Sequence, residues 1–266
     1  MNERPELLPN ENPVIPEGIN VSSHHPLREL GLLTAGAIGL FIVLSVVVWS
    51  ILTFGARYIP MSWETRLSQS IENLLETDLP DSQIQIDLQS RLDRIVQQID
   101  EQNTFQLTAH YIDSDVVNAF ATLGGHVFVF SGLLDVIETD VGLDMVLAHE
   151  AAHVLNRDPI QAAAGTVGLQ LLMALVTGNG DFAQTSGLMN MGSNMLLLSY
   201  SREQERAADE RALEALKALY EDLTGADELF VFIQNSEGER AFPEFFSSHP
   251  NPSARIANIQ KAINSD

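Results

Sequence analysis

Two histidines four residues apart carry the clearest chemical signal in this sequence. His149 and His153 flank Glu150 in the stretch H-E-A-A-H. On a helix, residues four apart project from one face, so both imidazoles can bind a single metal ion. Glu150 lies about 100° around the helix from His149, where a carboxylate can reach a metal-bound water without binding the metal. The pattern predicts a zinc-dependent hydrolase; the alternative is an ordinary helix with two hydrogen-bonded histidines.

The residues around this motif favour a mostly buried helix. Apolar side chains recur at helical spacing on both sides of it, namely Leu143, Val146, Leu147, Val154 and Leu155. Asp140 is expected to cap the start of the helix. Asn156-Arg157-Asp158-Pro159 is expected to end it, because the residue before a proline avoids the α-helical region. A metal ion on the last two turns would be partly shielded from water.

A zinc ion held by two histidines needs a third protein ligand and an open position for water. A second, strongly charged helix is predicted from Ser199 to about Leu219. Most of its acids are expected to be solvated, but Glu205 and Asp209 are four residues apart and have alanines beside them, so another helix can approach closely. One carboxylate there can bind the metal, and a second, one turn on, can orient a histidine through its other ring nitrogen.

The remaining pattern predicts an α+β fold, mainly helical with a small sheet. Helices are expected at Ser62–Glu76, Asp87–Glu101, Ile160–Val176, Ser186–Leu198 and from Asn251-Pro252 through Ile263, and strands at Phe105–Tyr111, Val116–Ala121 and His126–Phe130. The helices Ile160–Val176 and Ser186–Leu198 are apolar but contain runs too short for a membrane crossing, so they are interpreted as buried; the alternative is contact with the bilayer surface. His126 is most simply a strand residue beside a turn.

The N-terminal part predicts a membrane anchor. Residues 1–29 contain five prolines and no apolar periodicity, which indicates a disordered tail. Residues 30–54 carry no charge and would form a helix of about 37 Å, enough to cross a hydrocarbon core of about 30 Å. A cleaved signal peptide fits less well, because the run is long and starts late. Gly31, Ala35 and Gly39 form a stripe of small residues that could contact a partner helix in the membrane. Residues 55–266 are assigned to the catalytic domain.

Composition excludes several classes of function. The sequence has 14 Lys and Arg against 36 Asp and Glu, a formal net charge of −22, so it offers no electrostatic basis for binding nucleic acid. It contains no cysteine, which removes disulfides, thiol nucleophiles and cysteine-based zinc sites together. Arg28 before the apolar run and Arg57 and Arg66 after it are too evenly balanced to orient the span.

Four motifs, in order, resemble the gluzincin metalloendopeptidases of metallopeptidase family forty-eight over about residues 60 to 264. They are N-A-F-x-x-x-G-G-x-V at Asn118–Val127, H-E-x-x-H at His149–His153, S-R-x-x-E-x-x-A-D at Ser201–Asp209 and H-P-x-x-x-x-R-I at His249–Ile256. Leu123 departs from the family, which often has proline before the paired glycines. The single span is also unlike the multi-span members.

The resemblance implies a zincin-like (gluzincin) domain that binds one zinc ion per chain. Its ligands would be His149, His153 and Glu205, and Asp209 would orient a ligand histidine. Glu150 would be the general base. His249 would lie near the developing oxyanion, and Asn118 and Arg255 would line the substrate side of the cleft together with it. Periplasmic and intermembrane-space members of the family favour a bacterial inner-membrane protein with its catalytic domain in the periplasm.

The predicted function is therefore a membrane-anchored zinc metalloendopeptidase that hydrolyses unfolded or misassembled proteins. If the strand His126–Phe130 lies at the edge of the sheet, His126, Val127 and Phe128 would hold an extended peptide by strand addition. The alternative is a membrane-tethered chaperone or binding protein in which zinc only stabilises the fold. Glu150 argues against that alternative, because a structural zinc site has no need of this carboxylate.

Overall fold

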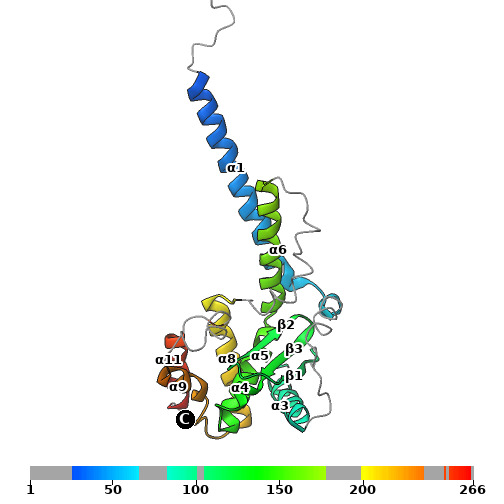
Figure 1. Ribbon diagram of the computed structural model, residues 1–266, viewed down its shortest axis with the longest axis vertical. Helices are drawn as coiled ribbons and strands as arrows, with labels where there is room; N and C mark the ends of the chain where they lie inside the picture. Colours follow the sequence, from blue (N-terminus) through cyan, green and yellow to red (C-terminus); the bar gives the residue numbers. More distant parts are fainter. Residues whose placement is uncertain are drawn as a thin grey trace, which may run out of the picture. The chain divides into compact units, whose positions relative to one another are not determined.

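The computed structural model describes residues 26–65, 83–100, 105–177, 199–236, 249 and 252–264. Its elements are α1 (Pro26–Gly55), the short 3-10 helix η1 (Ala56–Tyr58), α3 (Gln83–Ile99), β1 (Thr108–Ile112), β2 (Ala119–Thr122), the 3-10 turn η2 (Leu123–Gly125), β3 (His126–Phe130), α4 (Ser131–Leu134), α5 (Asp140–Leu155), α6 (Asp158–Thr177), α8 (Arg202–Leu219), α9 (Glu228–Asn235) and α11 (Pro252–Ile263) (Figure 1). The chain divides into two compact units, Met1–Val46 and Val47–Asp266. The predicted helix at 186–198 lies outside the described residues.

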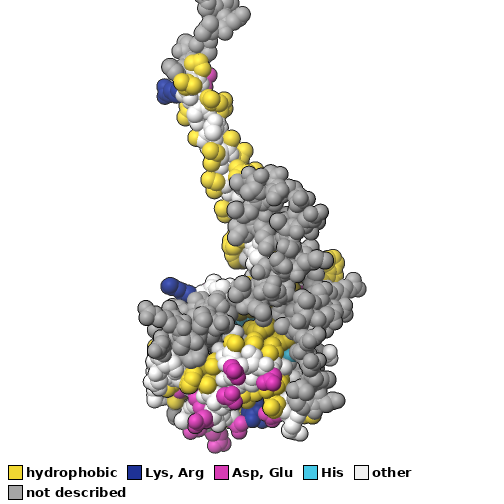
Figure 2. All heavy atoms as spheres, viewed as in Figure 1, with side chains coloured by type: hydrophobic (Ala, Val, Ile, Leu, Met, Phe, Trp, Pro, Cys, Tyr) yellow, Lys and Arg dark blue, Asp and Glu magenta, His cyan; other side chains and the backbone are white. Residues whose placement is uncertain are grey.

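Helix α1 carries no charged residue after Glu29, and none of its residues is buried. It begins at Pro26, so residues 26–29 belong to this helix and not to the expected tail; proline suits a first turn because its missing N–H has no partner there anyway. Within the described residues, one helix is long and apolar enough to cross a membrane (Figure 2). No described atom lies within 4 Å of a Cβ built at Gly31 or Gly39, so a partner helix at this stripe stays a prediction.

The three expected strands form one sheet in the order β1-β3-β2. Strand β3 pairs in parallel with β1 and antiparallel with β2, so both of its edges are occupied. The expectation that His126–Phe130 lies at the edge of the sheet is therefore wrong. Val127 and Phe128 are fully buried, in keeping with a central strand.

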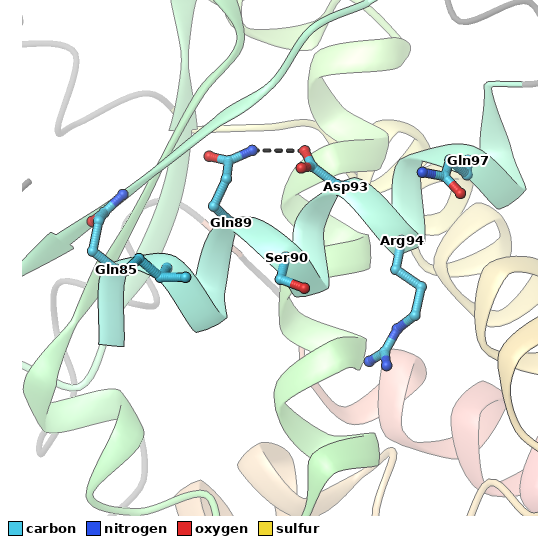
Figure 3. A pocket seen from close by; sticks show the side chains of 7 residues that line it. Gln85, Gln89, Ser90, Asp93, Arg94 and Gln97 are labelled. Atoms are coloured by element: carbon cyan, nitrogen blue, oxygen red, sulfur yellow. Dashed lines mark hydrogen bonds between the residues drawn. The ribbon is translucent and has the colours of Figure 1, made fainter. Parts of the chain in front are cut away.

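Two glutamines of α3 cover the outer edge of β1. Gln89 accepts a hydrogen bond from the N–H of Ala109 (2.9 Å), and Gln85 accepts one from the N–H of Tyr111 (2.8 Å). Their amide nitrogens donate to the carbonyls of Leu107 and Ala109. Figure 3 shows both side chains reaching from α3 toward the strand, with Gln89 also bonded to Asp93. These amides satisfy the outer edge of β1, and β2, whose residues are all buried, forms the other edge of the sheet.

The core lies between the sheet, α3, α5 and α8, with α5 between the sheet and α8 (Figure 1). Its fully buried members include Leu92, Ile95, Val127, Val129, Leu147, Ala148, Ala151, Ala208, Ala212 and Leu216. Alanines at the contact between α5 and α8 have small side chains, which allows the two helices that carry the predicted metal ligands to approach closely. This is the role expected for the small residues around Glu205.

Helix α5 begins one residue earlier than its predicted cap implied. Thr139 is the cap, and its hydroxyl accepts a hydrogen bond from the N–H of Gly142 (3.0 Å), whereas Asp140 is the first helical residue. Glu228 from α9 also accepts hydrogen bonds from the backbone N–H groups of Glu138 and Thr139. A carboxylate at this end complements the helix dipole. The start of α5, which carries His149 and His153, is therefore held by α9.

Arg157 forms the junction between α5 and α6. It adopts a left-handed backbone (φ 66°), which is uncommon for a residue with a side chain. Its guanidinium contacts the segment after α1 through an ion pair to Glu64 (2.5 Å) and a hydrogen bond to the carbonyl of Ile59. Glu64 in turn accepts a hydrogen bond from the N–H of Gly124 (3.3 Å). This sharp turn starts α6 directly after α5.

Candidate metal centre

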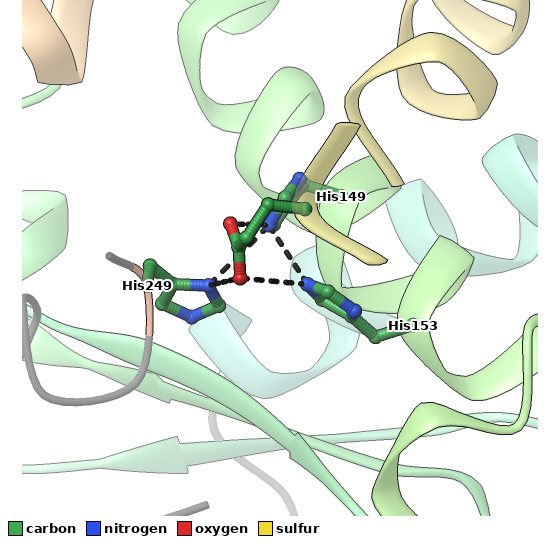
Figure 4. Close-up of side chains that lie close together, drawn as sticks. His149, His153 and His249 are labelled. Atoms are coloured by element: carbon green, nitrogen blue, oxygen red, sulfur yellow. Dashed lines mark hydrogen bonds and ion pairs between the residues drawn. The ribbon is translucent and has the colours of Figure 1, made fainter. Parts of the chain in front are cut away.

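Helices α5 and α8 bring the predicted ligands together. His149, His153, Glu205 and His249 are all buried, and each offers a ligand atom within 4.8 Å of the others. The Nε2 atoms of His149 and His153 are 3.0 Å apart, and the Glu205 oxygens lie 3.5 and 3.6 Å from them. Figure 4 shows the three imidazoles turned toward one another.

Carboxylates hold the outer nitrogens of both motif histidines. Asp209 lies 2.9 Å from Nδ1 of His149, as the sequence predicted for an orienting acid. Asp158 lies 2.8 Å from Nδ1 of His153. Because a carboxylate accepts a hydrogen bond, these contacts place a proton on each Nδ1, and when Nε2 carries no proton its lone pair points to the centre. The two lone pairs and the Glu205 anion then face one another.

This donor set fits a zinc ion. Metal–ligand bonds of about 2.0 to 2.1 Å in a tetrahedral site place ligand atoms roughly 3.3 Å apart, close to the distances between these three side chains. Lone pairs and an anion so close together repel unless a proton or a metal ion neutralises them. Burial and Arg255 lower the pKa of His149, but Asp209 and Glu205 raise it to about 9, so these acids favour positive charge where a metal ion would lie. Two imidazole nitrogens with one carboxylate oxygen form a ligand set typical of catalytic zinc.

Asp158 is a candidate site residue that the sequence interpretation missed, because that interpretation treated its stretch only as the end of a helix. It is the first residue of α6, and Gln204 of α8 donates a hydrogen bond to its other oxygen (2.8 Å). Gln204 also completes the capping box of α8 with Ser201. Burial raises the pKa of Asp158 to about 6, and the hydrogen bond from Gln204 opposes that rise. The sequence does contain one signal for this role, because Asp158 is an acidic residue at the start of the helix that follows the H-E-x-x-H motif.

Tyr200 is a second residue that the sequence did not single out. Its ring stacks on His153 with centroids 4.0 Å apart, and its hydroxyl lies 3.4 Å from the carbonyl of Ala121 in β2. The aromatic plane restricts rotation of the imidazole. Tyr200 therefore helps to hold His153 and links it to the edge strand.

Arg255 lies among the carboxylates of the site and is almost fully buried. Its guanidinium forms two hydrogen bonds to Asp209 (both 2.8 Å) and an ion pair with Glu205 (2.6 Å). It also lies over the Phe230 ring, 4.9 Å from its centroid. These contacts position the two acids, so the contact with substrate expected from the resemblance stays a prediction.

Glu150 faces the same centre from α5. Its carboxylate accepts a hydrogen bond from the backbone N–H of Ala121, and its Oε1 lies 3.4 Å from Nε2 of His249. Burial raises the pKa of Glu150, which strengthens it as a proton acceptor. Burial would also raise the pKa of Glu205, but His249 and His149 hold it well below its usual value. Glu205 therefore stays an anion beside the two imidazoles.

Of the other predicted site residues, some lie at the metal centre and some do not. His249 reaches the centre, with Nδ1 3.1 Å from Glu205. Asn118 is buried at the start of β2, and its Oδ1 has no hydrogen-bond partner among the described residues. His126 does not join the centre: it bonds to His110 of β1 (2.9 Å) within the sheet. Burial, with His126 beside it, lowers the pKa of His110 to about 4.

The fold and the donor set together define a metallopeptidase-type domain, in which two helices supply the metal ligands beside a small sheet. The sequence model of peptidase family M48 matches residues 82–263, and the chain belongs to this family. This confirms the family suggested by the four motifs.

Three curated relatives illustrate the range of the similarity. The mitochondrial metalloendopeptidase OMA1 of Schizosaccharomyces pombe is 34% identical over 155 residues, 57% of this chain and 45% of that protein. The metalloprotease LoiP of Escherichia coli is 29% identical over 59% of this chain and 62% of its own length. The beta-barrel assembly-enhancing protease of Escherichia coli is 24% identical over 61% of this chain and 36% of its own length. The match spans less than two thirds of each of these relatives.

Proposed function

We propose that this protein is a membrane-anchored zinc metalloendopeptidase. The observation that carries the proposal is the pair of Nε2 atoms 3.0 Å apart, each on an imidazole whose other nitrogen meets a carboxylate, with Glu205 and Glu150 beside them. Relatives named as metalloendopeptidases and metalloproteases support it. The apolar helix α1 supports the anchor.

His149, His153 and Glu205 would hold the zinc ion, which when bound makes a water molecule acidic and polarises a carbonyl group. Glu150 accepts the proton of the attacking water and passes it to the leaving amine. A hydrolytic site needs a position that is open to water, so His249 must leave that position free and donate toward the oxyanion. Asp209 and Asp158 keep both ligand histidines in the required tautomer.

Strand β2 supports a way of holding the substrate. Phe130 donates a hydrogen bond to the carbonyl of Asn118 (3.2 Å), so in this antiparallel pair Asn118, Phe120 and Thr122 face β3, and Ala119 and Ala121 point away from it. The outward groups of Ala121 meet Glu150 and Tyr200. Ala119 is buried, and it directs its N–H and carbonyl to the same side, where an added strand would pair with them beside the metal donors. This favours extended segments of unfolded proteins as substrates.

Ala119→Pro tests this edge. The substitution removes the outward N–H, which the pairing with β3 does not use, and adds a proline ring at this buried edge residue. Losing one main-chain hydrogen bond should weaken substrate binding by roughly 2- to 10-fold, read as a higher KM with kcat less affected. Ala119→Ser, which keeps the N–H, is the matched control. Unchanged KM in a folded, zinc-loaded Ala119→Pro protein would show that substrate does not bind along β2.

Metal removal tests the function itself. The purified full-length protein in detergent should cleave casein, lose cleavage after treatment with 1,10-phenanthroline and regain it when zinc is added back. The chaperone alternative predicts a different result, in which zinc-loaded protein binds casein and leaves it intact. Absence of cleavage across several unfolded substrates would refute the protease.

The resemblance also supports a catalytic domain on the outer side of a bacterial inner membrane. Protease added to spheroplasts should then digest this domain. Full protection in spheroplasts, with digestion after lysis, would place the active site in the cytoplasm.

A further inference from the structure

Helix α6 runs antiparallel to the C-terminal end of α1. Near its start, Ile160 and Ala163 form a small apolar cluster with Ala56, just after the end of α1. Further along, Gly165 and Gly168 meet the last turns of α1 itself. Residues further along α6 therefore contact residues earlier in α1, as expected for two antiparallel helices. Figure 1 shows the two helices side by side at this point.

The contact depends on small residues of α6. A Cβ built at Gly165 would lie 3.3 Å from Oγ1 of Thr53, and one built at Gly168 would lie 3.3 Å from atoms of both Leu52 and Trp49. Glycines at such positions let two helices approach closely, as they do between membrane helices. These residues of α1 lie within the stretch that would cross the bilayer.

The part of α6 that follows Gly168 contains no charged residue. The sequence after Gly168 is LQLLMALVT, and the only charged residue of the whole helix is Asp158 at its start. From Gly165 to Thr177 the helix advances about 18 Å, less than the roughly 30 Å of a hydrocarbon core. The sequence interpretation assigned this helix to a buried core, because its apolar run is too short for a crossing, and left contact with the bilayer surface open.

We propose that α6 enters the bilayer beside α1 and contacts lipid acyl chains without crossing the membrane. The inference rests on the proposed anchor, because α6 is placed by its contact with α1. A helix can enter hydrocarbon since its backbone groups are paired internally. Leucine and valine favour that environment by a few tenths of a kcal/mol each.

The inference also places the metal centre at the membrane surface. Asp158, which bonds to His153, is the first residue of α6 and lies about 10 Å along the helix from Gly165. The chain would then hold its catalytic domain close to the bilayer through two helices, with Asp158 at the base of the second.

Lipid-dependent fluorescence quenching tests this, helped by the absence of cysteine from the sequence. Single cysteines are introduced at each position from 169 to 176, at Leu40 of α1 and at the exposed Asp135. Each full-length protein is labelled with a nitrobenzoxadiazole fluorophore in detergent and reconstituted into phosphatidylcholine vesicles. Quenching by doxyl groups on the lipid chains is then compared with quenching by aqueous iodide.

We expect the α6 labels to lose fluorescence to the doxyl lipids, most strongly on one face at a period of about 3.6 residues, and to resist iodide. The Leu40 label should behave in the same way, and the Asp135 label should respond to iodide alone. If the α6 labels respond to iodide, or to neither quencher, while the Leu40 label responds to lipid, α6 lies in water or within protein and only the inference about α6 fails. If the Leu40 label also responds to iodide, the anchor itself is wrong.

Discussion

Glu150→Gln is expected to abolish visible turnover of casein while zinc and the fold are retained. Glutamine has nearly the same size and can still accept the hydrogen bond from Ala121, but it cannot take a proton from water. Loss of a general base alone typically lowers the rate by about 10²- to 10⁴-fold. Oε2 of Glu150 is buried without a hydrogen-bond partner among the described residues, as expected for an oxygen that serves the attacking water.

The measurement compares casein cleavage, bound zinc and thermal unfolding in the wild type and in Glu150→Gln. Glu214→Gln on the exposed face of α8 is the matched control, because it makes the same chemical change away from the metal centre. A zinc-loaded Glu150→Gln protein that still cleaves casein at the wild-type rate would remove Glu150 from the mechanism. A wild type that only binds casein would instead favour the chaperone alternative.

Glu205→Gln is expected to lose zinc, whereas Glu203→Gln is expected to keep it. Glu205 is buried beside both imidazoles, while Glu203, two residues away, points to solvent and pairs with Arg206 (2.5 Å). Losing a direct ligand should lower zinc affinity by more than the about 10- to 100-fold typical of residues that only orient a ligand. Asp158→Asn should fall within that smaller range, because it acts on His153 through Nδ1.

Zinc affinity is measured by competition with a chromophoric chelator. Glu205→Gln also weakens the buried pair with Arg255, and breaking such a pair can cost about 3 to 5 kcal/mol of stability. Glu205→Asp is therefore tested beside it, because it keeps the charge opposite Arg255 and withdraws the oxygens from the metal. Equal zinc affinity in the Glu205 and Glu203 variants, with all proteins folded, would exclude Glu205 as a ligand.

The sequence by itself determined those features of the site that depend on spacing within one helix. His149 and His153 share a face, and so do Glu205 and Asp209, because residues four apart on a helix point the same way. The apolar run that became α1 and the strand His126–Phe130 were equally local, since composition and alternation are read over a few residues. The motif order added His249, which lies 100 residues from His149.

Only the tertiary structure decided which strand is central, which residues hold His153 and which helix α6 packs against. Strand order depends on pairing between distant segments, so the periodicity of His126–Phe130 could not show that β3 is central and β2 is the edge. Asp158 reaches His153 because the left-handed turn at Arg157 brings α6 back against α5, and Arg255 lies between two acids of α8 because α11 packs there. Such contacts arise from packing over long sequence separations, which a pattern within one segment does not encode.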